Sequence, residues 1–133
     1  MENALGTTAQ DIMVFCKSEG FLAKQLYVVL TTPVAGLAAV REQMQAHLDF
    51  QIELERKGIL FGAGPFFSED GLDWAGEGMV IIRATSLAQA HEIAASDPMH
   101  KSGARVFQLR PWVLNEGSFT LQVSYSDGRC QMV

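Results

Sequence analysis

Three histidines, together with a few acidic and basic residues, carry most of the chemistry that this sequence could perform. His47 follows Met44 by three residues and Val40 by seven, so it falls on or beside the apolar stripe of a predicted helix. An imidazole in that place faces inward or into a pocket. It could act as a general acid or base, because it titrates near neutral pH. It could also be a core or interface histidine whose nitrogens bond to backbone or water.

Asp97 is the best candidate partner for His47. It ends a second predicted helix, in the segment SDPMHKSGAR. If both helices pack side by side on one face of a sheet, the two residues can meet, and the carboxylate can fix the tautomer of the imidazole. Asp-Pro is also a common helix stop, so Asp97 could serve only to turn the chain. His100 and Arg105 follow by three and eight residues and offer an imidazole and a guanidinium, unless they are solvated surface groups.

Metal binding is the main competing chemistry for the histidines. His47, His91, His100 and Asp97 are acceptable ligands, but no close pair of His or Cys residues gives the usual two-ligand anchor. We therefore predict no metal site.

Two further chemistries find no support in the residue spacing. The glycines Gly62, Gly64 and Gly71 do not form a phosphate loop, because no helix and no lysine-threonine pair follow them. Cys16 and Cys130 lie near opposite ends of the chain and are interpreted as reduced thiols, without a nearby histidine to activate either.

The elements that must position these residues follow the order strand, helix, strand, strand, helix, strand. Apolar runs, caps and breaks predict strand Gln25–Thr31, helix Val34–Lys57 ending at Gly58, a hairpin of Ile59–Phe61 with Met79–Ala84, helix Leu87 to about Ser96 capped by Ser86, and strand Arg105 to about Val113. This is a split βαβ arrangement, so the predicted fold is α+β and ferredoxin-like with an antiparallel sheet. A short leading helix over residues 8–18 and a C-terminal strand or arm over 119–125 are expected in addition.

The apolar patterning of the strands predicts a partner. Two helices cover one face of a four-stranded sheet, yet the first three strands are apolar on both faces. Burial of the second face against another copy of the same sheet is the simplest explanation, so we expect a homodimer.

Length and composition restrict the class of protein. The chain has 133 residues, 48% of them hydrophobic, which is typical of one globular domain. The net charge of −5, with scattered basic residues, argues against nucleic acid as a partner. The longest apolar stretch is too short to cross a membrane, and the N-terminal residues lack the pattern of a signal peptide. We therefore expect a cytoplasmic protein.

Two segments resemble the YCII-related family. AHLDFQIELERKGILFGAGP, from Ala46 to Pro65, is similar to the histidine-containing helix and glycine-proline strand end of that family, and SDPMHKSGARVFQLRPW is similar to its Asp-Pro loop and closing strand. The two segments cover most of residues 25–114, so the resemblance implies a family core at about 25–114, with residues 1–20 and 117–133 as extensions. It also implies a ferredoxin-like dimeric α/β barrel with a pocket in each subunit and with His47 and Asp97 as the active-site pair. One branch of the family resembles a dehydrochlorinase that acts on a chlorinated hydroxymuconate.

The matching motifs also suggest residues that bind substrate. These are His100, Arg105, Gly64, Pro65 and Trp112. Many relatives carry an arginine three residues before the histidine, where this chain has Met44, so Arg105 or Arg110 would have to take over the binding of a carboxylate.

Two functional hypotheses follow. The first is an enzyme, of lyase or isomerase type, that moves a proton with His47 and Asp97 on a small polar or anionic metabolite and needs no cofactor. The second is a non-catalytic ligand-binding or accessory dimer in which the same pair is structural. A solvent-reachable cavity at His47 would favour the first, and a sealed His47 the second.

Overall fold

The structure is a computed structural model that describes residues 6–133, so the first five residues of the expected N-terminal extension lie outside it. The chain separates into two compact units, which are described one at a time. One unit is Gln25–Val113, and the other combines the described part of Met1–Lys24 with Leu114–Val133.

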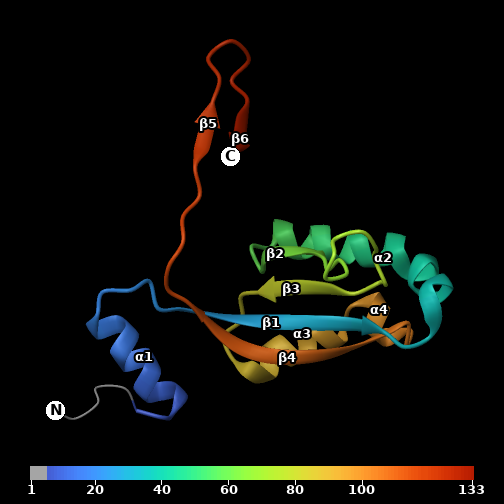
Figure 1. The fold of residues 1–133 in the computed structure, drawn as a ribbon, viewed down its shortest axis with the longest axis horizontal. Helices are drawn as coiled ribbons and strands as arrows, with labels where there is room; N and C mark the ends of the chain where they lie inside the picture. Colours follow the sequence, from blue (N-terminus) through green and yellow to red (C-terminus); the bar gives the residue numbers. More distant parts are fainter. Residues whose placement is uncertain (1–5) are drawn as a thin grey trace. The chain divides into compact units, whose positions relative to one another are not determined.

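The unit Gln25–Val113 is built on a four-stranded antiparallel sheet (Figure 1). Its strands lie in the order β2-β3-β1-β4, with bounds β1 Lys24–Pro33, β2 Leu60–Pro65, β3 Gly78–Ile82 and β4 Arg105–Leu114. The central pair β1 and β3 is antiparallel, and Val29 lies opposite Val80 in its register. Together with the two long helices, this order is that of a split βαβ fold, which confirms the predicted ferredoxin-like α+β class.

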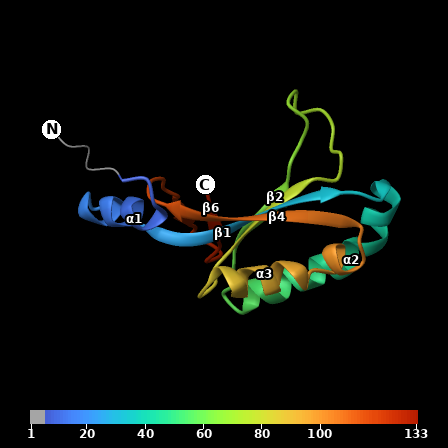
Figure 2. The same cartoon turned by 90° about the horizontal axis from the view of Figure 1, so that it is seen from below.

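Three helices cover one face of this sheet (Figure 2). They are α2 Gly36–Arg56, α3 Leu87–Ala95 and α4 Pro98–Lys101. Ser86 caps α3 as predicted, since its side chain accepts a hydrogen bond from the backbone of Gln89. Gly58 follows α2 with a φ of +73°, which matches its predicted place beyond the helix end.

The start of α2 differs from the prediction by two residues. Pro33 does not open the helix but ends β1, and the backbone N–H of Val34 donates to the carbonyl of Ala104 at 3.2 Å. That bond holds Val34 beside the start of β4, where the chain bends, so the helix begins only at Gly36.

The Asp97-Pro98 step both ends one helix and begins another. Ser96 is the C-cap of α3, close to the predicted end. Asp97 then caps the short helix α4, because its side chain accepts from the backbone N–H of Met99 at 2.9 Å, while Pro98 occupies the first turn. This second helix was not expected from the sequence, and it fixes the Asp97 side chain at its N-terminus.

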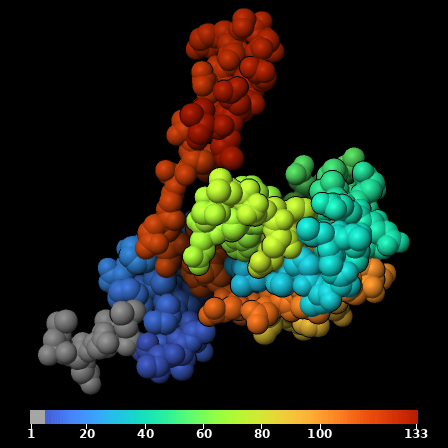
Figure 3. Space-filling view, turned by 45° about the vertical axis from the view of Figure 1, so that its right-hand side comes forward, coloured from blue at the N-terminus to red at the C-terminus, as the bar shows by residue number. Residues whose placement is uncertain are grey.

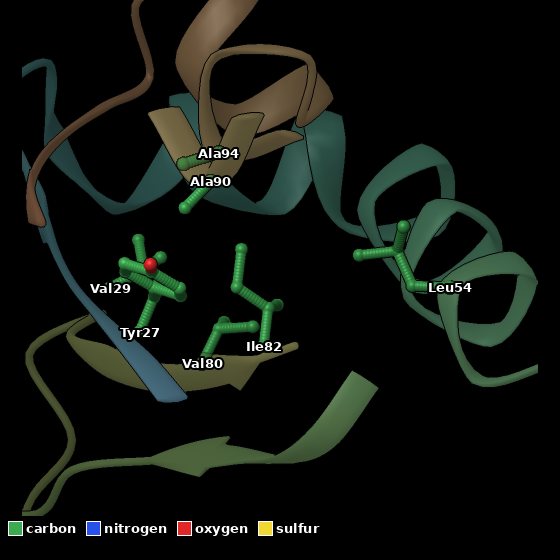
Figure 4. Packing of buried hydrophobic residues seen from close by; sticks show 7 residues of the cluster. All are labelled: Tyr27, Val29, Leu54, Val80, Ile82, Ala90 and Ala94. Atoms are coloured by element: carbon green, nitrogen blue, oxygen red, sulfur yellow. The ribbon is translucent and has the colours of Figure 1, made fainter. Parts of the chain in front are cut away.

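The core lies between the sheet and the helices (Figure 4). Alternate residues of β1 and β3 point toward the helices, and α3 meets them with small side chains. The buried cluster is Tyr27, Val29, Leu54, Val80, Ile82, Ala90 and Ala94. A second cluster, Val40, Met99 and Ala104, joins α2 to α4 and to the chain before β4.

The other unit contains α1 Ala9–Ser18 and a hairpin of β5 Leu121–Val123 with β6 Cys130–Met132. A capping box between Thr8 and Asp11 starts α1, which confirms the predicted leading helix. The side chains of the hairpin strands are exposed (Figure 3). β5 was expected, whereas β6 was not, because its short segment carries no alternating pattern.

Two other expectations concern the state of the cysteines and the possibility of a membrane-spanning helix. Cys16 is buried, Cys130 is exposed, and both are free. Within residues 6–133, none of the helices combines the length and the apolar character that crossing a membrane would take.

The core makes a direct prediction about stability. Ile82 is 1% exposed between the sheet and the helices, so Ile82→Ala should lower the free energy of unfolding by about 2–5 kcal/mol. Leu87→Ala is the matched control, because Leu87 is half exposed and should change this free energy by less than about 0.5 kcal/mol. Urea denaturation of both variants measures the difference. Equal losses of unfolding free energy in the two variants would mean that Ile82 is not a core residue.

Candidate functional site

His47 and Asp97 are in contact, as the sequence predicted. Nδ1 of His47 lies 2.8 Å from one carboxylate oxygen of Asp97 and 3.0 Å from the other, and both residues are buried. An ionised carboxylate only accepts hydrogen bonds, so Nδ1 carries a proton and donates a hydrogen bond to Asp97. In the neutral ring, Nε2 therefore has a free lone pair. This is the arrangement that a histidine needs in order to take a proton from another group.

His47 opens onto a cavity of about 570 Å³. The cavity lies between α2, the facing ends of β2 and β3, and the loop that joins these strands. Its polar lining comes from Thr31, His47, Gln51, Glu77 and Arg105. Its apolar lining comes mainly from Met44, Leu48, Phe67, Trp74, Met79 and Val80. The cavity has the size and the mixture of apolar walls and few polar groups that are typical of small-molecule sites.

Arg105 places a cation at this cavity. The residue is 4% exposed, and its Nε–H donates to the carbonyl of Gly76 at 2.9 Å. Burial lowers the pKa of the guanidinium from its ordinary value, while the charge of Asp97 raises it. Among the described residues, no carboxylate forms an ion pair with Arg105 within 4 Å. A buried guanidinium without a carboxylate partner favours binding of an anionic group from a ligand.

Gly76 allows that contact to form. Its φ is +90°, and a Cβ there would lie 2.6 Å from the Pro33 side chain. A side chain at this position would therefore push the loop away from β1 and move the carbonyl that holds Arg105.

His100 lies behind the cavity wall and does not line it. Its Nδ1 lies 2.6 Å from the carbonyl of Ala94, and its Nε2 lies 2.8 Å from the hydroxyl of Thr31. Since a carbonyl only accepts, Nδ1 carries the proton and Nε2 accepts from Thr31. The ring also packs against Phe107 at 4.6 Å between centroids. His100 therefore orients Thr31, which does reach the cavity.

The other predicted residues divide into two groups. Gly64 and Pro65 line the cavity. Trp112 is 40% exposed near the end of β4 and is not part of the lining, and Arg110 is exposed on the same strand. His91 is exposed on α3 beside Phe107.

Over the described part of the chain, no three His, Cys, Asp or Glu side chains lie close enough together to hold a metal ion.

Several lining residues were missed at the sequence level. Gln51 had a usable signal, because it follows His47 by four residues and must share its helix face. Thr31 and Trp74 had none. Their places depend on the pairing of β1 and on a loop hydrogen bond from the Trp74 indole to the carbonyl of Glu77 at 2.9 Å.

The buried His100 predicts how stability depends on pH. Burial is the main cause that lowers its pKa from the ordinary value of 6.5, and the bond to Ala94 and the charge of Asp97 oppose this shift. As pH falls below 6.5, the unfolded chain binds a proton that the folded chain does not, so the free energy of unfolding decreases. Above that pH the residue makes no such contribution.

Urea denaturation on both sides of pH 6.5 tests this effect. His100→Gln should flatten the pH dependence, whereas His91→Gln, at an exposed position, should leave it as in the wild type. Identical slopes in both variants would contradict the assigned environment of His100.

Comparison with solved structures shows a protein of similar fold. It is 5-chloro-2-hydroxyhydroquinone dehydrochlorinase from Burkholderia phenoliruptrix AC1100, in complex with 2,5-dihydroxybenzoquinone. The TM-score is 0.55 at 22% sequence identity, with 65% of this chain and 92% of that chain covered. At this identity the likeness establishes the shared fold. No curated protein matches the chain.

The sequence itself matches a family model over most of its length. The matching family is the YCII-related domain, and the match covers residues 25–113. This range coincides with the compact unit Gln25–Val113 that holds His47, Asp97 and the whole cavity lining. The chain therefore belongs to the YCII-related family.

Proposed function

We propose that this protein is a cofactor-independent enzyme, of lyase or isomerase type, that acts on a small polar or anionic metabolite. The observation that carries the proposal is that the buried His47–Asp97 pair opens onto a cavity of about 570 Å³. A structural pair has no need of such an opening. Proton transfer by a positioned histidine needs no further cofactor.

The proposed roles follow from the geometry. Nε2 of His47 takes a proton from an acidic C–H or O–H group of the substrate, and the electron pair stays on the substrate. Asp97 holds the ring and stabilises the imidazolium that forms, through the bond to Nδ1 at 2.8 Å. Arg105 stabilises the negative charge on the substrate from the cavity wall. The protonated His47 then returns the proton at another atom of the substrate. Alternatively, the anion expels a leaving group, which departs with the electron pair of its bond, and His47 releases its proton to that group or to water.

The walls of the cavity favour a partly apolar substrate with an anionic group. Met44, Leu48, Phe67 and Trp74 supply apolar contact area, and Arg105 supplies a single cation. The structural neighbour is a dehydrochlorinase bound to a dihydroxybenzoquinone, which is a ring. An oxygenated ring that can ionise therefore fits the proposal better than the open-chain hydroxymuconate that the family resemblance suggests.

The competing hypothesis is a ligand-binding or accessory module without turnover. The cavity at His47 supports binding of a small molecule under either hypothesis, so binding alone does not separate them. Turnover that depends on the imidazole does.

A paired screen distinguishes the two functions. Wild type and His47→Gln are screened against small hydroxylated and halogenated ring acids by thermal shift, and each hit is then tested for conversion. We expect both proteins to bind the same compounds, with conversion lowered by about 10²–10⁴-fold in His47→Gln. Compounds that stabilise the wild type but are never converted would support the binding module instead.

We also propose that the protein is a homodimer formed through the sheet face opposite the helices. By alternation along β4, Val106 lies on this face, and it is 53% exposed. An apolar hollow of about 340 Å³ also lies there, lined in part by Phe61, Phe66, Met79 and Ile81. Apolar area of this kind is typical of an interface, and a second copy offers a matching surface.

A charge placed on this face should prevent the dimer. Light scattering should give about twice the chain mass of 14.6 kDa for the wild type and the single-chain mass for Val106→Asp. Leu87→Asp is the control, because it adds the same charge at a half-exposed position on the helix side. A wild type that is monomeric, or a dimer unaffected by Val106→Asp, would exclude this interface.

A further inference from the structure

Gln51 is a buried amide whose hydrogen bonding is incomplete. The residue is 7% exposed, and its Oε1 is buried without a partner among the described residues. Its Nε2 lies 3.4 Å from Nε2 of His47, one turn earlier on α2. That distance is long for a hydrogen bond. A buried acceptor without a partner is uncommon in a folded protein and needs a physical explanation.

The protonation state of His47 supplies that explanation. In the neutral ring, Nδ1 donates to Asp97, and Nε2 can accept from the Gln51 amide N–H. Once Nε2 has taken a proton, both facing nitrogens are donors, and the contact becomes unfavourable. A half-turn of the amide about its terminal torsion would then bring Oε1 to Nε2–H. This torsion is broad and roughly two-fold, so the turn meets little resistance.

We propose that Gln51 is a positioning residue whose amide reverses when His47 Nε2 gains a proton. This inference rests on the proposed function of His47 as a proton acceptor. At rest the long contact to Nε2 is weak enough for a substrate proton donor to displace it. After transfer, the substrate bond to hydrogen is broken, the Nε2–H bond is formed, and Oε1 of Gln51 accepts from it. The amide thus holds the proton on His47 until it is returned.

Other charged or titratable groups lie near Gln51 and His47, and each of them affects the protonation of the His47 ring. Asp97 contacts His47 from the start of α4, and Arg105 and Glu77 line the cavity from the strand side. His100, which contacts Thr31, is close enough to Asp97 and His47 for their charges to affect its pKa. A test must therefore separate the contact between Gln51 and His47 from the general effect of an added charge.

Substitution at Gln51 and at Gln45 provides such a test. Gln45 lies on the same helix two residues before His47, and its amide donates to Asp49 in an exposed position. Gln51→Glu presents only acceptor oxygens to Nε2, so it should hold the proton on Nε2 at neutral pH. Gln45→Glu adds the same charge without the buried contact and should leave His47 as in the wild type.

Nitrogen NMR of the histidine rings in the free protein gives the readout. We expect both ring nitrogens of His47 to show the protonated signature in Gln51→Glu at a pH where the wild type and Gln45→Glu show it only at Nδ1. The same His47 spectrum in both Glu variants would overturn the proposal. If Gln51→Glu does not fold, the Gln51 amide resonances of the wild type decide the question. These resonances should shift over the same pH range in which the His47 ring gains its second proton. If they do not change over that range, the proposal is wrong.

These measurements need no substrate, so their outcome is independent of the proposed reaction. If the His47 spectrum changes in Gln51→Glu but no substrate is ever converted, the enzyme proposal is wrong and the coupling between Gln51 and His47 stands. If a substrate is converted but the His47 spectrum does not change in Gln51→Glu, the coupling is wrong and the enzyme proposal stands. In an active enzyme, Gln51→Met, which keeps the shape but removes the amide, should lower kcat more than it changes KM.

Discussion

The hydrogen bond between His47 and Asp97 joins two residues that lie 50 positions apart, and most of the site depends on it. Both side chains are buried, so each depends on the other for hydrogen bonding. Removing His47 would leave the buried Asp97 carboxylate with only its backbone bond from Met99, and a buried polar group that loses its partner costs about 1–3 kcal/mol, or more when it is charged. The pair can exist only if α2 and α4 are held at a fixed separation. The packing of Val40 against Met99 and Ala104 provides that restraint.

Asp97 has two tasks that reinforce each other. One carboxylate oxygen accepts from the backbone of Met99 and so begins α4, while both oxygens lie within hydrogen-bonding distance of His47 Nδ1. The carboxylate is therefore oriented before any substrate arrives. A site held by backbone bonds in this way loses little freedom when it binds, which is the general advantage of preorganisation.

Local signals were sufficient to place most helices and strands, and the fold inferred from their order was sufficient to bring His47 and Asp97 together. Ser86 and Gly58 mark helix ends, and the helical spacing of His47 places it toward the sheet. Other features depend on pairings that no local pattern encodes. Arg105 reaches back 29 residues to Gly76, and His100 turns toward Thr31 rather than toward the cavity. Helix α4 was missed because a four-residue helix has no periodicity to detect.

The two halves of the helix layer show how one fold supplies both stability and a site. Under α3, the small side chains Ala90 and Ala94 allow close packing against Tyr27 and Ile82, and the core there is apolar. Under α2, Met44 and Leu48 line a cavity instead of filling it. The Oε1 atom of Gln51, which is buried and has no hydrogen-bond partner among the described residues, lies on this side. Such groups destabilise a folded chain unless something else satisfies them, so the close-packed side must supply the stability that the open side lacks. The division explains why residues that could react are concentrated next to α2, although both helices lie on the same face of the same sheet.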